Sequence, residues 1–174
     1  MCLLLGVRGV GKTLLLKQLQ AVLSGEQVNQ KETPPTIPTV GTNLVTLKFG
    51  KKTCTVRELG GCMAPIWNSY FKGVTHLIFM IDLAHRQQVA ASCIELLNSL
   101  SSNDLQEVRV LILFNKIDIE VPVGMTFTEI SSILRLDDIM STSPQTVDVL
   151  HCSAIRGDGL SEVVQWLETH ASHN

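Results

Sequence analysis

The segment Gly6–Thr13, GVRGVGKT, constrains this chain more than any other part of its sequence. Its spacing, G-x-x-x-x-G-K-T, is typical of a turn that joins a buried strand to a helix and wraps its backbone N–H groups round phosphate oxygens. The flanks fit this interpretation, because the apolar run Cys2–Leu5 precedes the segment and the amphipathic segment Lys12–Leu23 overlaps its end. The motif therefore predicts a phosphate-binding loop, with an ordinary strand–turn–helix as the alternative.

The residue types of this loop suit the binding of a nucleotide polyphosphate. Glycine lets the backbone turn tightly enough for successive N–H groups to converge on phosphate oxygens, and the start of the helix adds partial positive charge. Lys12 is expected to reach the β- and γ-phosphates, and the Thr13 hydroxyl to ligate Mg²⁺. Arg8 either lies over the phosphates or points to solvent. The loop residues predicted to bind nucleotide are Gly6, Arg8, Gly9, Val10, Gly11, Lys12 and Thr13.

Beyond the loop, strand-like apolar runs alternate with segments of helical periodicity. Further strands are expected at His76–Asp82, Val108–Asn115 and Thr146–Cys152. Leu44–Phe49 and Thr53–Val56 are expected to form a hairpin. The further helices are expected at Gln87–Leu100, at Thr126–Leu134 and from Leu160 onward. Ser24–Pro38 is expected to be a polar loop. This order predicts an α/β fold with a mostly parallel six-stranded sheet, one antiparallel edge strand, helices on both faces, and one domain over residues 1–174.

Composition and charge disfavour several other classes of protein. With 45% hydrophobic and 17% charged residues, the chain is typical of a globular protein rather than a disordered one. The chain has 14 basic and 16 acidic residues, and the basic ones are not grouped into a stripe along the sequence, which disfavours a nucleic-acid partner. The five cysteines include no C-x-x-C pair, so reduced thiols in the cytoplasm are expected rather than disulfides or a zinc site. No apolar run is long enough to span a bilayer, and no secretory leader is recognisable.

A second group of polar residues follows two of the expected strands. Asn115, Lys116 and Asp118 lie in the segment FNKID, where a carboxylate can accept hydrogen bonds from the N1–H and the exocyclic amine of guanine. Adenine lacks the N1–H, so Asp118 would select guanine. Ser153 and Ala154 follow another strand, and a backbone N–H there can donate to guanine O6. Taken alone, each segment is also typical of a solvated turn at a strand end.

Together, these motifs resemble a small GTPase of the ADP-ribosylation-factor-like (Arf-like) branch. PTVGTN (Pro38–Asn43) resembles switch I of that branch, GGCMAPIWNSYF (Gly60–Phe71) its switch II, and GDGLSEVVQWL (Gly157–Leu167) its last helix. The resemblance implies the P-loop small-GTPase fold, GTP or GDP and Mg²⁺ as ligands, and a molecular switch that recruits protein effectors in its GTP state. It also implies that Thr39 senses Mg²⁺ and the γ-phosphate. The metal ligands would then be Thr13, Thr39 and Glu58.

Two residues in this region depart from the family pattern. Glu58 stands where the family has Asp, which holds Mg²⁺ through water, so the longer side chain would bind the metal imperfectly or displace a water. Gly60 keeps the N–H that is expected to bond the γ-phosphate. Cys62, beside Gly61 in the catalytic position, replaces the Gln that orients the attacking water. A thiol is a weak hydrogen-bond partner, so hydrolysis is expected to be slow unless a partner supplies the missing group.

The resemblance also concerns the surface of the protein. The family's N-terminal amphipathic helix has no counterpart in this sequence, and Cys2 stands in place of the glycine that is myristoylated, so no N-terminal lipid anchor is expected. The protein is expected to be a monomer that binds effectors and regulators through switch I, the hairpin and switch II. The expected contact residues are Thr39, Phe49, Ile66, Trp67 and Tyr70. Core packing is the alternative role for the apolar residues among them.

Three functions remain open on the sequence. The first is a GTP-binding switch with slow intrinsic hydrolysis. The second is a catalytically dead scaffold that is permanently loaded with a structural nucleotide. The third is a nucleotide kinase that uses the same phosphate loop, although no arginine-rich lid is evident and the guanine-reading residues argue against it.

Overall fold

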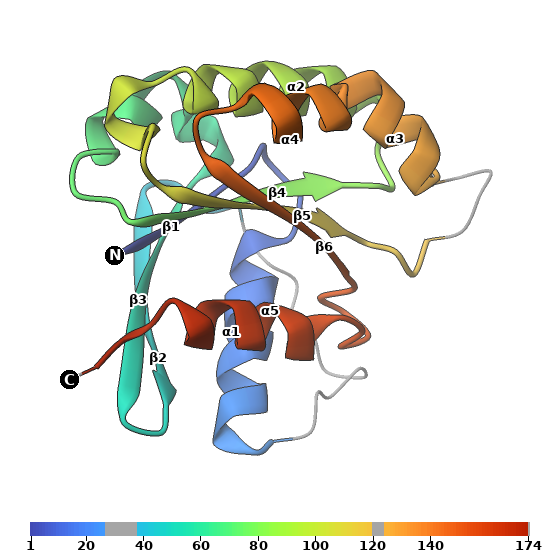
Figure 1. Cartoon of the computed structure of the whole chain (residues 1–174). Helices are drawn as coiled ribbons and strands as arrows, with labels where there is room; N and C mark the ends of the chain where they lie inside the picture. The colour runs from blue at the N-terminus through green and yellow to red at the C-terminus, as the bar shows by residue number, and fades with distance from the viewer. Residues whose placement is uncertain (27–37, 120–123, 174) are drawn as a thin grey trace.

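The long apolar runs of the sequence form the central strands of one sheet (Figure 1). The structure is a computed structural model, and it describes residues 1–26, 38–119 and 124–173. Its main strands lie in the order β2–β3–β1–β4–β5–β6. Their bounds are β1 Cys2–Leu5, β2 Thr42–Phe49, β3 Lys52–Leu59, β4 His76–Asp82, β5 Arg109–Asn115 and β6 Thr146–Cys152.

The pairing of these strands follows the expected pattern. β1 pairs in parallel with β3 and β4, and β5 and β6 extend the parallel part of the sheet. β2 pairs antiparallel with β3 and forms the edge of the sheet. The prediction of a mostly parallel sheet with one antiparallel edge strand is therefore confirmed. A two-residue strand that the sequence did not predict, β7 (Ser172–His173), also pairs antiparallel with Lys52–Thr53.

Helices cover both faces of the sheet (Figure 1). α1 and α5 lie on one face, and α2, α3 and α4 lie on the other together with the 3₁₀ helix η1. Their bounds are α1 Lys12–Ser24, η1 Gly61–Tyr70, α2 Arg86–Leu100, α3 Phe127–Leu134, α4 Leu136–Thr142 and α5 Leu160–Thr169. Among the described residues, none of these helices combines the length and the apolar character needed to cross a membrane.

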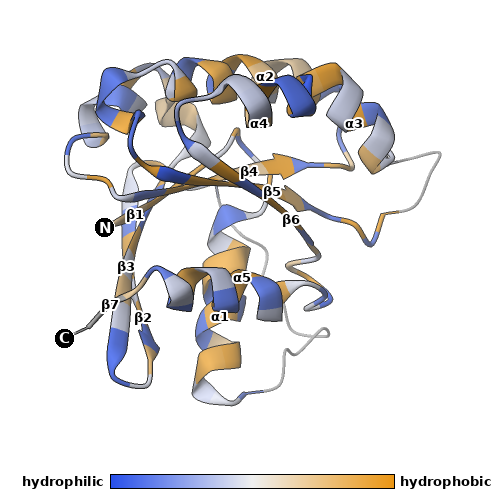
Figure 2. Cartoon of the chain, viewed as in Figure 1, coloured by the Kyte–Doolittle hydropathy of each residue, from blue (hydrophilic) through white to orange (hydrophobic). Residues whose placement is uncertain are grey.

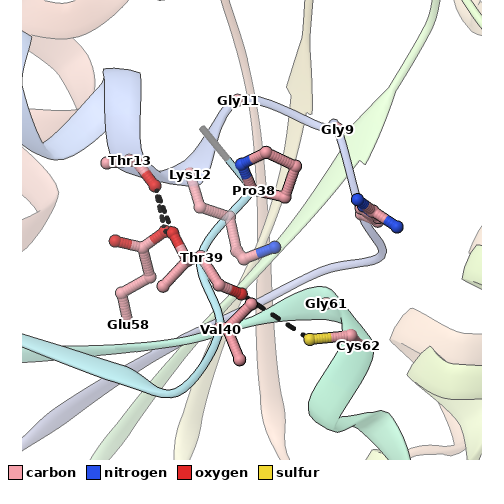
Figure 3. Close-up of a pocket in the computed structure, with 11 residues that line it drawn as sticks. Gly9, Gly11, Lys12, Thr13, Pro38, Thr39, Val40, Glu58, Gly61 and Cys62 are labelled. Carbon is pink, nitrogen blue, oxygen red and sulfur yellow. Dashed lines mark hydrogen bonds between the residues drawn. The ribbon is translucent and has the colours of Figure 1, made fainter. Parts of the chain in front are cut away.

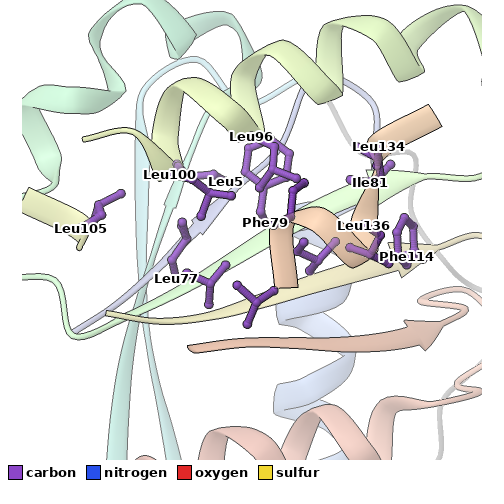
Figure 4. Packing of buried hydrophobic residues seen from close by; sticks show 14 of the residues in the cluster. Leu5, Leu77, Phe79, Ile81, Leu96, Leu100, Leu105, Phe114, Leu134 and Leu136 are labelled. Carbon is purple, nitrogen blue, oxygen red and sulfur yellow. The ribbon is translucent and has the colours of Figure 1, made fainter. Parts of the chain in front are cut away.

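The apolar core is divided by the sheet into two clusters. Side chains alternate along a strand, so Leu3 and Leu5 of β1 join the cluster under α2, whereas Cys2 and Leu4 join the one under α1 and α5. Figure 4 shows the first cluster, in which Phe79 packs between the sheet and α2. In Figure 2 the central strands around β4 are accordingly largely orange, the colour of hydrophobic residues, whereas orange and blue alternate along the helices. This burial on both faces explains why the central strands are continuous apolar runs.

Some elements differ from the sequence-based prediction. β3 runs to Leu59, beyond the predicted end at Val56, because its last residues pair with β1 and β2 rather than ending the hairpin. η1 and α4 were not predicted, since a 3₁₀ helix and a seven-residue helix each lack a long 3.6-residue pattern. The loop expected over Ser24–Pro38 lies mostly outside the described residues, and α1 continues to its first residue.

Candidate nucleotide-binding site

The phosphate loop closes between β1 and α1, at the carboxyl ends of the parallel strands, where ligands bind in sheets of this kind. Gly11 precedes α1 with φ 100°, a conformation that favours glycine. A Cβ atom on Gly6 would lie 2.5 Å from the carbonyl oxygen of Met80, and one on Gly11 would lie 2.6 Å from Nδ2 of Asn115. The packing around the loop therefore requires glycine at both positions.

A cavity of about 270 Å³ opens beside this loop (Figure 3). Four segments that are distant in the sequence surround it, namely the phosphate loop, residues 38–40, the end of β3 and the start of η1. Its lining residues are Arg8, Gly9, Gly11, Lys12, Thr13, Pro38, Thr39, Val40, Glu58, Gly61 and Cys62. All of these except Pro38 and Val40 are predicted site residues, so the structure brings the phosphate and metal candidates together. Arg8 is exposed and lines the cavity.

Lys12 is held against the phosphate loop itself. Its Nζ donates hydrogen bonds to the carbonyl oxygens of Gly6 at 2.7 Å and Val7 at 3.1 Å. Burial lowers the pKa of Lys12 from 10.5 to about 8, while the negative charge of Glu58 acts in the opposite direction. The ammonium group is thus protonated at neutral pH, partly desolvated, and placed where an anionic ligand would interact with it strongly.

Three oxygen-bearing side chains meet on the other side of the cavity. The Oγ1 atoms of Thr13 and Thr39 lie 2.9 Å apart, and the Thr13 hydroxyl donates to Oε1 of Glu58 at 2.5 Å (Figure 3). Glu58 is only 1% exposed. Hydroxyl and carboxylate oxygens are the ligands that Mg²⁺ prefers, so the donor set fits this ion.

The segment that resembles switch II begins with close backbone packing against the phosphate loop and the segment that resembles switch I. The Gly60 N–H donates to the carbonyl oxygen of Gly41 at 2.9 Å, so in this structure it does not point to a phosphate. Gly61 is the glycine that lines the cavity, and a Cβ atom there would collide with the backbone of Arg8. Cys62 is exposed, and its thiol donates to the carbonyl oxygen of Thr39 at 3.6 Å.

Asn115 connects the residues predicted to bind the base to the phosphate loop. Its Nδ2 donates to the carbonyl oxygen of Val10 at 2.8 Å, and its Oδ1 accepts the N–H of Ala154 at 3.0 Å. Of the two residues expected to offer a backbone N–H to guanine O6, Ala154 thus directs its N–H at a side chain in this structure. Asn115 is nearly completely buried, so its contribution is to hold the two loops together.

Asp118 and Lys116 lie on the turn that follows β5. Oδ1 of Asp118 accepts a hydrogen bond from the Ser153 hydroxyl at 2.6 Å, which fixes the carboxylate. Lys116 adopts φ 67°, and its Nζ lies 2.6 Å from Oδ2 of Asp82. Asp82 also accepts the Ala84 N–H at 2.8 Å. Sequence reasoning missed Asp82, although a carboxylate that ends an apolar strand was the signal that could have indicated it.

The predicted partner surface needs a correction. Trp67 is only 2% exposed, because its ring packs edge-on against Phe79 and its Nε1 donates to the carbonyl oxygen of Gly60 at 3.1 Å. Phe49 is buried between the hairpin and the helices of the α1 face. For these two residues the expected exposure is therefore wrong, and the alternative of core packing applies, whereas Ile66 is 49% exposed.

Other residues near the switches contribute to the surface. Tyr70 is half-buried, with the Arg57 guanidinium 5.8 Å from its ring centre. Val40 and Leu44 are strongly exposed, and sequence reasoning missed both. For Leu44 the signal was its place on an edge strand with alternating burial.

Comparison with known proteins agrees with this geometry. The family model described as "ADP-ribosylation factor family" matches residues 1–171. The chain belongs to this family. It is 48% identical over 176 residues to ADP-ribosylation factor-like protein 16 of Homo sapiens, with 100% of this chain and 88% of that protein covered. It is 34% identical to ADP-ribosylation factor-like protein 1 of Caenorhabditis elegans, with 95% and 85% covered.

A solved structure also has this fold. The Arl6 BBS3 small GTPase from Trypanosoma brucei, bound to the nucleotide analogue GppNp, matches with a TM-score of 0.79. The match covers 97% of this chain and 95% of that chain, at 22% sequence identity, so the likeness concerns the fold alone. The chain is therefore an Arf-like small GTPase with a phosphate-binding loop. Members of this family are guanine-nucleotide-binding switches that interact with effectors and regulators.

Proposed function

We propose that this Arf-like protein is a GTP-dependent switch that hydrolyses GTP slowly on its own and recruits effectors in its GTP state. The observation that carries the slow hydrolysis is the exposed thiol of Cys62 on the wall of the phosphate cavity. The side chain in this position has to orient a water for attack on the γ-phosphate. A thiol is a weak donor and a weak acceptor, and it lacks the paired donor and acceptor of an amide.

In this proposal the phosphate and the metal are bound by separate walls of the cavity. The backbone N–H groups at the start of α1 and the ammonium of Lys12 hold the phosphates. Thr13, Thr39 and Glu58 would hold Mg²⁺, which neutralises charge that develops on the β- and γ-phosphates when it is bound. Asp118, fixed by Ser153, would accept hydrogen bonds from guanine.

The same contacts supply a mechanism for the switch. Thr39 contacts both Thr13 and Cys62, while Gly60 is bonded to Gly41, so switch I and switch II are joined next to the cavity. A ligand that displaces Thr39 would therefore disturb switch II as well. Effectors would read this change through Thr39, Ile66 and Tyr70, together with the exposed Val40 and Leu44. We further propose that the protein works as a monomer in the cytoplasm, in keeping with its free cysteines.

The test measures nucleotide content and turnover on the purified protein. We expect bound GTP or GDP, competition by guanine but not adenine nucleotides, and multiple-turnover phosphate release that is slow compared with a Gln-bearing Arf. Binding of GTP with no release above the buffer rate would instead support a permanently loaded scaffold. Equal competition by ATP would contradict the role of Asp118 and reopen the kinase interpretation.

A further inference from the structure

The oxygen atoms of Thr13, Thr39 and Glu58 form a small triangle, and this inference rests on the proposed Mg²⁺-dependent function. Its edges are 2.9 Å between the two hydroxyls, 2.5 Å from Thr13 to Oε1 of Glu58, and 3.4 Å from Thr39 to the same Oε1. In an octahedral Mg²⁺ site with bonds of about 2.0–2.1 Å, neighbouring ligand oxygens lie about 3 Å apart. The triangle thus has the size of one octahedral face.

The position of Oε1 matters because the family pattern has Asp here, which reaches the metal through a water. A carboxylate that binds through water leaves space for that water between itself and the hydroxyl ligands. Oε1 of Glu58 instead lies within hydrogen-bonding distance of both hydroxyls. The side chain of Glu is one methylene longer than that of Asp, and these distances leave no room for a water between Oε1 and the two hydroxyls.

Asn43 contacts the other carboxylate oxygen of Glu58. It lies opposite Glu58 in the β2–β3 register, and its Nδ2 donates to Oε2 at 3.2 Å. This bond occupies one oxygen and leaves Oε1 on the side of Thr13 and Thr39. Residues that hydrogen-bond to a metal ligand in this way fix its orientation and affect metal affinity.

The burial of Glu58 adds an independent argument. The side chain is 1% exposed, and the ion pairs among the described residues include none to its carboxylate. Lys12 lines the same cavity and its charge interacts with that of Glu58, but no cation of the described residues forms an ion pair with this buried carboxylate. A divalent ion in contact with Oε1 would offset the cost of burying the charge. We propose that Glu58 is a direct, inner-sphere ligand of Mg²⁺ alongside Thr13 and Thr39, and that Asn43 positions its carboxylate.

The number of water ligands on the metal tests the first part of this proposal. Mn²⁺ replaces Mg²⁺ in the complex with a non-hydrolysable GTP analogue, and the broadening of its electron paramagnetic resonance lines in ¹⁷O-water counts the bound waters. We expect the parent protein to carry one water fewer than Glu58→Asp. Equal water numbers in the two proteins would overturn the proposal.

The second part is tested by Asn43→Ala, with Asn43→Ser as a second variant in case the first does not fold. We expect the affinity of the nucleotide complex for Mn²⁺ to fall about 10- to 100-fold, the usual effect of losing such a supporting bond. Thr46→Ala is the matched control, because it removes a 3.3 Å bond to Thr55 across the same hairpin, and it should leave the affinity unchanged. An unchanged affinity in a folded Asn43 variant would overturn the positioning role.

A double substitution tests whether Asn43 acts through Glu58. If it does, Asn43→Ala should change Mn²⁺ affinity less than twofold in a Glu58→Asp background, and a full additional loss would contradict that route.

Two outcomes separate this inference from the proposed function. If the parent binds the GTP analogue but has the water number of Glu58→Asp, only the inference fails. If the parent does not bind the analogue at all, the proposed function fails with it.

Discussion

In the proposed function, single side chains account for slow hydrolysis at this site. The phosphate loop, with Lys12 and Thr13, has the groups needed to hold a nucleotide, and the structure places them around one cavity. Cys62 also lines the cavity, in the position where the family pattern has an amide. We therefore expect that substitutions can change binding and hydrolysis separately, and each of two predictions concerns one of these properties.

Cys62→Gln should accelerate single-turnover hydrolysis of preloaded GTP, because it restores a donor and an acceptor for the attacking water. A tenfold gain corresponds to about 1.4 kcal/mol off the barrier. The gain is expected to be modest without a partner, since no arginine of the described switch residues lines the cavity. The arginine that lines it, Arg8, belongs to the phosphate loop. Cys62→Ser is the control and should stay slow. A parent rate that already equals that of a Gln-bearing relative would refute this account.

Asp118→Asn should shift the preference from guanine to xanthine nucleotides. The Asn amide N–H can donate to the additional carbonyl of xanthine. Against guanine, the same N–H faces the exocyclic amine, which is also a donor, so only the amide oxygen can accept a hydrogen bond from the base. Competition between GTP and XTP for a fluorescent nucleotide measures the change. Asp137→Asn, an exposed aspartate on α4, is the control. An unaltered preference in Asp118→Asn would remove this residue from the base site.

At the scale of elements, the parts set by local sequence could be predicted, and the parts set by tertiary contacts could not. The phosphate loop and β4 follow from spacing and apolar runs alone. The course of η1 depends on Trp67, which packs on Phe79 of β4, a contact that no periodicity encodes. For the same reason the sequence left open whether Trp67 is a surface or a core residue. β7 has two residues and carries no pattern at all.

Trp67→Phe tests how η1 is fixed to the start of switch II. The substitution keeps an aromatic ring against Phe79 but removes the bond from Nε1 to the Gly60 carbonyl oxygen. The free energy of unfolding should fall by about 1 kcal/mol for the bond, and further for the lost ring volume. Trp166→Phe is a matched control on α5, at a distance from switch II. Urea denaturation measures both, and faster nucleotide release is expected for Trp67→Phe only.

At the scale of the whole molecule, the two ends of the parallel strands have different chemistry. The candidate nucleotide site lies at the carboxyl ends, and a polar cluster lies where β4 and β5 begin. There Arg109 donates to Asp148 at 3.1 Å and to Nε2 of His170 at 2.9 Å, and the ring centres of His76 and His170 lie 5.1 Å apart. His170 also bonds the Trp166 carbonyl oxygen through Nδ1. The cluster connects the end of α5 to the sheet, so its protonation bears on stability rather than on nucleotide binding.

His76→Gln tests this separation through the pH dependence of stability. Burial, with His170, the N-terminal ammonium and Arg109 nearby, lowers the pKa of His76 from 6.5 to about 4. Between these two values the unfolded chain binds a proton at this residue that the folded protein does not, so the free energy of unfolding falls as the pH drops from 6.5 towards 4. His76→Gln cannot take up that proton, and the stability difference between parent and variant should therefore shrink on acidification. Urea denaturation at a series of pH values measures this difference, and GTP affinity at pH 7.5 should be the same in both proteins because the cluster lies at the far end of the strands. A difference in stability that stays constant from pH 7 to pH 4 would show that His76 does not titrate in this way.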